Sequence, residues 1–248
     1  MIKLLRTNFY MIFHSLSFWV LLLSMPLADI FILLLADEQL KDKIEWNIVS
    51  FGDSCFLHLL LMGYASAILA GMQFGGELTF GTVRNKLTAG VCECVIVHLF
   101  SAAVSFTICC IRYGFDGDLR TVGMLTANSL PPAAAFAAAA LFFVTAAGER
   151  TAGILTAFGA DLIFKMTADM FLLDRLVSKR DKLSETAKRL IIAADSLIPS
   201  GYCEWFYSFG EMSRDTGLEK MPSCGWCCVT LILFSAAGAA VFCRKDLK

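Results

Sequence analysis

The chain has 248 residues, of which 57% are hydrophobic and 17% are charged, and its formal net charge is -1. Soluble globular domains contain roughly 45–50% apolar residues, so this composition excludes an ordinary water-soluble fold. A net charge near zero supplies no basic field that attracts nucleic acid, which is therefore excluded as a partner.

Six apolar segments are long enough to cross the hydrocarbon core of a bilayer, which is about 30 Å thick and needs about 20 helical residues. Each segment is a continuous apolar run, whereas transmembrane strands alternate over about 10 residues. The sequence therefore predicts an all-α membrane protein whose six transmembrane helices form a single transmembrane domain over residues 1–248. The segments are about Phe18 to Leu35, Cys55 to Phe74, Val95 to Ile111, Pro131 to Ala147, Ile154 to Leu173 and Cys224 to Phe242.

The basic residues of the short connections predict the orientation of the chain in the cell membrane, because Lys and Arg are retained on the cytoplasmic side. With six spans, both termini share a face with the second-to-third and fourth-to-fifth connections, and all four of these regions carry basic residues. The loop over residues 36–54 on the other face is mainly acidic, although Arg112 and Arg120 flank the next loop there. We therefore expect both termini to be cytoplasmic. The basic residues on this face are Lys3, Arg6, Arg84, Lys86, Arg150, Arg244, Lys245 and Lys248.

The N-terminal segment shows no cleavable signal, because its apolar run is too long for a signal-peptide core and lacks a clear small-residue cleavage site. Residues Ile2 to Ser15 place apolar and basic side chains on different sides of a helix. This pattern fits an interfacial helix lying on the membrane surface. A simple extension of the first span explains it equally well.

Three aspartates and one lysine lie inside predicted spans, where each charge costs about 2.5–3.5 kcal/mol at mid-membrane and so requires a partner or water. Asp161, Lys165 and Asp169 recur every four residues of the fifth span, which places them on one helical face where Lys165 can pair with either acid. This face is expected to line a substrate pathway or a subunit interface, or else to hold helices together through a structural ion pair. Asp29 follows Pro26 in the first span and has the same two interpretations.

Small residues predict close helix contacts in three spans, because they let helix backbones approach one another. These are Gly63, Ala67 and Gly71 in the second span, Ala133 to Ala140 in the fourth and Ala236 to Ala240 in the sixth. Pro131 and Pro132 are expected in the first turn of the fourth helix, where a missing amide hydrogen costs nothing.

The long loop from Asp174 to Ser223 contains a segment with helical periodicity. Its apolar residues from Leu183 to Ile198 fall on one face, its charged residues lie elsewhere, and Pro199 follows as a stop signal. We expect an amphipathic helix on the extracellular side. It either lies in the outer membrane surface or packs on the ends of the protein's own spans.

No catalytic motif is present, so we do not expect this chain to be an enzyme. His14, His58 and His98 are isolated in the sequence, and the Cys224–Cys227 spacing has no second pair that would complete a metal site. Most of the ten cysteines lie in or beside spans, where a free thiol packs as a small apolar group. The stretch GELTFGT has the glycine spacing of a phosphate-binding loop but places Thr82 where that loop needs lysine. We therefore expect no cofactor in this chain.

The segment GGELTFGTVRNKLTAG, residues 75–90, is a polar stretch between two apolar spans and must lie at one membrane face. Its central part is expected to form a short helix along the cytoplasmic surface, with Arg84 and Asn85 able to bind a soluble partner through directed hydrogen bonds. An ordinary basic connector is the alternative interpretation.

The segment resembles a signature of the permease subunits of type 2 ATP-binding cassette exporters, and the similarity extends over the whole chain. The matching pattern is E-x-x-x-G-T-x-R-N-K-L-x-x-G, present as Glu77, Gly81, Thr82, Arg84, Asn85, Lys86, Leu87 and Gly90. The resemblance implies that Glu77, Gly81, Thr82, Arg84, Asn85 and Lys86 form a coupling helix that contacts a separate ATPase subunit. Many relatives have Ser-Arg after the final glycine, whereas this chain has Cys92-Glu93, so the contact made there is not carried over.

The resemblance also implies the partners and the mechanism. ATP and Mg would be bound by the ATPase subunit, and two permease subunits, identical or different, would surround the substrate path within the lipid. Export of a peptide antibiotic, or immunity to one, is suggested by the resemblance alone. Two alternatives remain: a secondary carrier driven by an ion gradient, which usually shows repeated halves, and a membrane scaffold or sensor that transports nothing.

Overall fold

The computed structural model describes residue 10 and residues 13–39, 47–74, 83–113, 119–178, 182–207 and 224–246. The regular secondary structure in these residues is helical throughout, in agreement with the predicted all-α class. Most of the predicted interfacial helix over Ile2 to Ser15 lies outside the described residues. Glu77, Gly81 and Thr82 of the predicted coupling segment also lie outside them.

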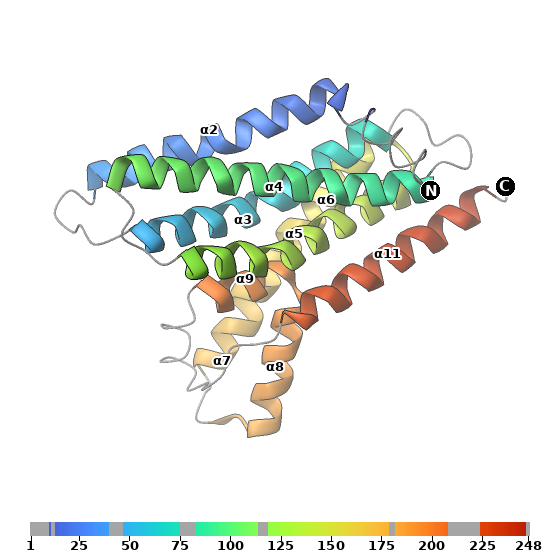
Figure 1. Cartoon of the computed structure of the whole chain (residues 1–248). Coiled ribbons are helices and arrows are strands. Elements are labelled where there is room, and N and C mark those ends of the chain that lie inside the picture. The colour runs from blue at the N-terminus through green and yellow to red at the C-terminus, as the bar shows by residue number, and fades with distance from the viewer. Residues whose placement is uncertain are drawn as a thin grey trace.

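The long helices run side by side with alternating direction (Figure 1). Two helical stretches, Gly90–Ile111 and Leu119–Ala147, are long and apolar enough to cross a membrane, and shorter apolar stretches occur at Phe18–Ala28, His58–Met72 and Gly225–Val241. Each predicted span falls within one continuous helical run. The elements are α2 (Leu16–Gln39), α3 (Asn47–Phe74), α4 (Val83–Tyr113), α5 (Leu119–Ala147), α6 (Arg150–Met166), the π-helix η1 (Thr167–Leu173), α7 (Asp174–Ser178), α8 (Glu185–Leu197), α9 (Pro199–Tyr207) and α11 (Gly225–Asp246).

Helix α5 lies at the centre of the bundle and packs against α3, α4, α6 and α11. Its alanine run from Ala133 to Ala140 is buried, as its small side chains predicted. Gly63 and Ala67 on α3 are buried as well. Close backbone approach on several sides is therefore the feature that makes α5 the core helix.

Two sequence predictions about small residues and prolines are wrong in part. Pro131 and Pro132 lie inside α5, which begins at Leu119 rather than at the prolines. In a packed bundle, neighbouring helices and local side chains compensate for the missing proline hydrogen bonds. In the segment from Ala236 to Ala240 only Gly238 is buried. The reason is that α11 packs against α5 through one of its faces, and the other faces of α11 are exposed.

The turn from α5 to α6 depends on glycine. Gly148 has a φ of 81°, a left-handed conformation that residues with a Cβ rarely adopt. One turn into α6, a Cβ on Gly153 would lie 3.1 Å from the Val144 backbone. These two glycines let α6 return along α5 at close range, and this return brings the polar face of α6 into the bundle.

The predicted amphipathic helix exists as α8, and it packs on the protein itself. Ser184 caps its start by accepting a hydrogen bond from the Ala187 amide at 3.2 Å. At its other end, Thr230 on α11 donates to the Leu197 carbonyl at 2.5 Å. Pro199, predicted as a stop signal, opens the next helix, α9, where a first-turn proline is favourable.

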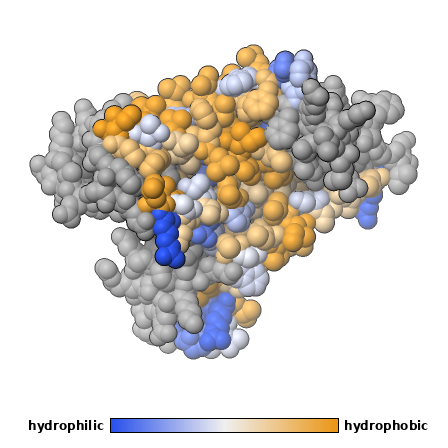
Figure 2. All heavy atoms as spheres, in the orientation of Figure 1, coloured by the Kyte–Doolittle hydropathy of each residue, from blue (hydrophilic) through white to orange (hydrophobic). Residues whose placement is uncertain are grey.

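Apolar side chains cover most of the visible side of the bundle, and hydrophilic ones gather on the projecting end that carries α8 (Figure 2). Large exposed apolar residues include Phe31 on α2, Leu155 and Ile163 on α6, and Ile232 on α11, each more than 60% exposed. Contiguous exposed apolar surface on this scale marks contact with a membrane or a protein partner.

Candidate functional site

The centre of the candidate site is an ion pair in the interior of the bundle. Asp161 and Lys165 lie one turn apart on α6, and the Lys165 Nζ is 2.6 Å from the Asp161 Oδ2. The two side chains are 7% and 14% exposed, respectively. The predicted pairing of these two residues is thus confirmed, with Lys165 bound to Asp161.

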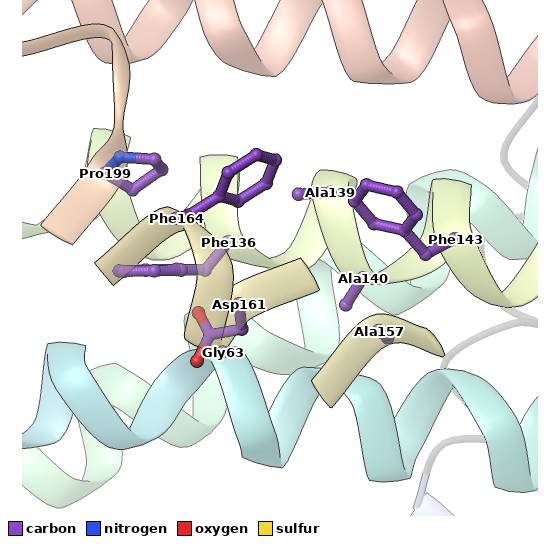
Figure 3. A pocket seen from close by; sticks show the side chains of 9 residues that line it. All are labelled: Gly63, Phe136, Ala139, Ala140, Phe143, Ala157, Asp161, Phe164 and Pro199. Atoms are coloured by element: carbon purple, nitrogen blue, oxygen red, sulfur yellow. The ribbon is translucent and has the colours of Figure 1, made fainter. Parts of the chain in front are cut away.

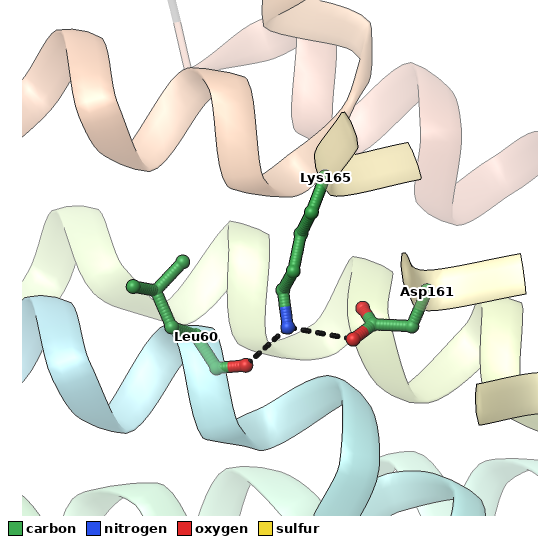
Figure 4. A network of polar contacts seen from close by, with 3 residues as sticks. All are labelled: Leu60, Asp161 and Lys165. Carbon is green, nitrogen blue, oxygen red and sulfur yellow. Dashed lines mark hydrogen bonds and ion pairs between the residues drawn. The ribbon is translucent and has the colours of Figure 1, made fainter. Parts of the chain in front are cut away.

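The Lys165 ammonium has three further contacts, all from other helices. It donates to the Leu60 backbone carbonyl on α3 at 2.5 Å (Figure 4). It also lies 4.1 Å from the centre of the Tyr64 ring and 5.9 Å from the centre of the Phe136 ring. Two oxygen acceptors and two aromatic rings therefore surround one buried cation.

Helix geometry explains why these side chains meet. Asp161 lies about three turns after the start of α6 at Arg150, and Phe136 lies about three turns before the end of α5 at Ala147. Because the two helices are antiparallel and joined by a tight turn, residues that are equally far from the turn lie at the same level along the helix axes. The sequence alone showed the acid and the lysine but gave no sign that Tyr64 and Phe136 face them.

Gly63 gives the Asp161 carboxylate room to enter the bundle. A Cβ at this position would lie 2.1 Å from the Asp161 Oδ1, far below any van der Waals contact. The close approach of α3 to α6 therefore requires glycine here. This contact gives a specific role to one of the small residues noted in the second span.

We expect Gly63→Ala to expel the Asp161 carboxylate from its place and to lower the free energy of unfolding by about 1–3 kcal/mol, the usual cost of overpacking a core. Gly159→Ala on α6 is the matched control, because its Cβ would meet nothing within 4 Å. Alanine is about 1 kcal/mol more favourable than glycine inside a helix, so the control should be neutral or stabilising. Unfolding of the purified chain in mixed detergent micelles measures both variants, and equal stabilities would contradict the role of Gly63.

A small cavity borders the Asp161 carboxylate (Figure 3). The empty space at this position is about 280 Å³, including space that is open to the outside, and it is narrow enough that at most about one water molecule fits between the walls. Apart from Asp161 its walls are apolar, with three aromatic rings and several alanines. The lining residues are Gly63, Phe136, Ala139, Ala140, Phe143, Ala157, Asp161, Phe164 and Pro199.

Asp169 does not share the position of the other two charged residues of its helix. The chain passes into the π-helix η1 at Thr167, where the Asp174 amide bonds to the Asp169 carbonyl five residues back. The wider turn changes the angular position of Asp169, and its carboxyl forms a hydrogen bond with Glu204 on α9 instead. The predicted four-residue spacing assumed an uninterrupted α-helix, and the π-helix breaks this assumption.

Glu204 lies in the loop between the predicted fifth and sixth spans. Burial, together with the neighbouring carboxylates of Asp169 and Asp195, raises the pKa of Glu204 to about 7. At mildly acidic pH Glu204 is therefore protonated, and its proton lies in the hydrogen bond with Asp169. The sequence indicated no such pair, because the two residues lie far apart along the chain, in the fifth span and in the loop that follows it.

We expect the contribution of Glu204 to the stability of the chain to fall as the pH rises from about 4.5 to about 7. In this window the folded chain keeps the Glu204 proton, whereas the unfolded chain, with an ordinary glutamate pKa of 4.5, loses it. Glu204→Gln should remove this contribution, so that over this pH range the unfolding temperature of the variant falls less, or rises more, than that of the parent chain. Glu185→Gln on the exposed part of α8 is the control, because Lys188 lowers the pKa of Glu185 and its contribution therefore has the opposite sign. An unchanged pH profile in Glu204→Gln would contradict the assignment.

Two histidines that are isolated in the sequence are neighbours in the bundle. The rings of His58 on α3 and His98 on α4 have centroids 6.2 Å apart. The His98 Nε2 lies 2.6 Å from the Ser129 hydroxyl, which itself donates to the Thr126 carbonyl. With the single Ser129 hydroxyl proton donated to Thr126, the His98 Nε2–H is the donor in this contact. His58 is nearly as far from the end of α3 as His98 is from the start of α4, so the antiparallel arrangement gives the two residues similar heights.

The structure places the remaining predicted residues as follows. Arg84, Asn85 and Lys86 form the first turn of α4, continuous with the apolar part of that helix rather than a separate short helix. Glu93, in the pair that departs from the exporter pattern, is completely buried, so it belongs to the interior and not to a surface for a partner. Asp29 lies in α2.

The ten cysteines are all present as thiols rather than disulfides, and Cys203, in the predicted outer loop, is completely buried. No group of three or more His, Cys, Asp or Glu side chains in the described parts of the chain is arranged to hold a metal ion. The buried polar groups of the described interior include the Asp161–Lys165 pair, the histidine pair, the carboxylates of Glu93 and Asp195, and several serines.

Comparison of the chain with protein-family profiles, curated proteins and solved structures gives no match. The functional argument therefore depends on the residues and geometry described above.

Proposed function

We propose that this chain is the membrane-spanning subunit of an ATP-binding cassette exporter. It would have six transmembrane helices with both termini in the cytoplasm, act as a dimer of permease subunits and be driven by a separate ATPase. ATP binding would bring the ATPase subunits together, and the segment around Arg84 would transmit this movement to the helices.

One observation supports the proposal most directly. The start of α4, which carries Arg84, Asn85 and Lys86, lies at the same end of the bundle as the C-terminal end of α11 (Figure 1). The projecting helices α7 and α8 lie at the opposite end. A soluble ATPase could therefore reach the exporter-like pattern from the face that the basic residues predict to be cytoplasmic.

The distribution of side chains supports the membrane part of the proposal. Charged and polar residues such as His58, His98 and Asp161 are buried, while large apolar residues on α2, α6 and α11 are exposed. Exposed Trp19 at the start of α2 donates from its Nε1 to the Phe13 carbonyl at 2.7 Å. Tryptophan prefers the membrane–water interface, which is the expected level of this end of α2.

The experiment that tests the proposal is reconstitution in vesicles with and without the ATPase encoded or purified with this chain. Export of a candidate peptide should require both proteins and ATP. Transport by the chain alone in an ion gradient would instead support a secondary carrier. An intact complex that moves no candidate peptide would support a scaffold.

A further inference from the structure

The contacts around the Lys165 ammonium form a cation site whose walls do not depend on Lys165. The Asp161 carboxylate lies on α6, the Leu60 carbonyl and the Tyr64 ring lie on α3, and the Phe136 ring lies on α5. We propose that this is a binding site for the primary ammonium group of an amphiphilic cation, and that Lys165 fills it as a tethered occupant that such a ligand replaces.

The geometry selects a primary ammonium group among biological cations. Its three N–H donors match two oxygen acceptors, at 2.5 and 2.6 Å from the Lys165 Nζ, and the face of Tyr64 at 4.1 Å. A guanidinium prefers two parallel acceptors in its plane, which a single carboxylate oxygen and a backbone carbonyl do not supply. A quaternary ammonium has no donor for these oxygens. A hard metal cation takes about six oxygen ligands, whereas aromatic rings form half of this site.

The cavity beside the ion pair accounts for the apolar part of the ligand. Asp161 and Phe136 belong both to the cation site and to the cavity wall, and the rest of that wall is apolar, including Phe143 and Phe164. A ligand that places its ammonium against Asp161 can therefore direct an alkyl or aromatic group into this space. Since the space is narrow in this structure, the bound group would displace aromatic side chains that line it (Figure 3).

Lys165 competes with any free ligand because its four-carbon stem keeps the ammonium at a high effective concentration. The identification of this ligand as the exported substrate rests on the function proposed above. The site itself does not, because it is a property of the single chain.

Replacement of the lysine stem should reveal the site. Lys165→Ala, purified in detergent, should bind about one equivalent of radiolabelled n-butylammonium per chain and should show a rise in unfolding temperature with butylammonium concentration. The double variant Asp161→Asn with Lys165→Ala should bind it at least tenfold more weakly. Butanol and tetramethylammonium should not stabilise Lys165→Ala, because one lacks the charge and the other lacks the N–H donors.

Lys188→Ala is the matched control, since Lys188 forms an exposed helical ion pair with Glu185 and its loss opens no interior site. If Lys165→Ala aggregates in sodium chloride, purification in butylammonium chloride should yield a monodisperse protein. Equal binding by the single and double variants, absence of saturable binding, or aggregation in both salts would overturn the proposal. Because the ATPase is absent, these results bear on the cation site and not on the exporter function, which the vesicle experiment tests separately.

Discussion

Lys165→Met should lower the free energy of unfolding by about 3–5 kcal/mol, the usual cost of leaving one charge of a buried pair without its partner. The Asp161 carboxylate would remain inside the bundle, on a side chain that is 7% exposed and packed against Gly63, with its cationic partner removed. The double variant Asp161→Asn with Lys165→Met should recover most of this loss, because it leaves no uncompensated charge. Unfolding of the three proteins in mixed detergent micelles gives the coupling energy of the pair.

Lys188→Met is the control for this measurement, because the pair of Lys188 with Glu185 is exposed and contributes at most about 1 kcal/mol. Additive effects of the Asp161 and Lys165 substitutions would contradict the pairing. Transport by the stable double variant then separates the two interpretations of the pair. A loss of at least tenfold indicates a pathway residue, whereas full transport indicates a purely structural ion pair.

The double variant Arg84→Ala with Asn85→Ala should reduce transport at least tenfold while the ATPase subunit continues to hydrolyse ATP. The substitutions remove the charge and the directed hydrogen bonds through which this turn is proposed to bind the ATPase. A partner can shift the permease between two states only through contacts that differ between those states. Simultaneous measurement of phosphate release and peptide uptake in vesicles gives the coupling ratio.

Arg175→Ala with Lys182→Ala is the matched control, because both residues are exposed on the part of the chain at the opposite end of the bundle. This control should leave transport and its coupling ratio unchanged. An unchanged coupling ratio in the Arg84 and Asn85 variant would refute the assigned role of this turn. A lowered unfolding temperature in that variant would show that the turn stabilises the bundle instead.

Composition and periodicity were sufficient to predict the helical class, the approximate positions of the long helices in the described residues, the amphipathic helix α8, and a pairing of Lys165 with one of the two aspartates on its predicted face. These features depend on interactions within about 20 residues, such as apolar run length, helical spacing and the capping of α8 by Ser184. Predictions from local sequence were wrong where packing between helices outweighed local conformational preference. Pro131 and Pro132 lie inside α5, and η1 displaces Asp169 from the face that its spacing predicts.

The composition of the candidate site, in contrast, was decided by the tertiary structure. Leu60, Tyr64 and Phe136 meet Lys165 only because α3, α5 and α6 lie at particular heights and rotations relative to one another. The same is true of His58 with His98 and of Asp169 with Glu204. Helical periodicity specifies which face of each helix is polar or small, but the partner of that face depends on how the helices pack, since contacts between distant segments leave no spacing pattern in a single sequence.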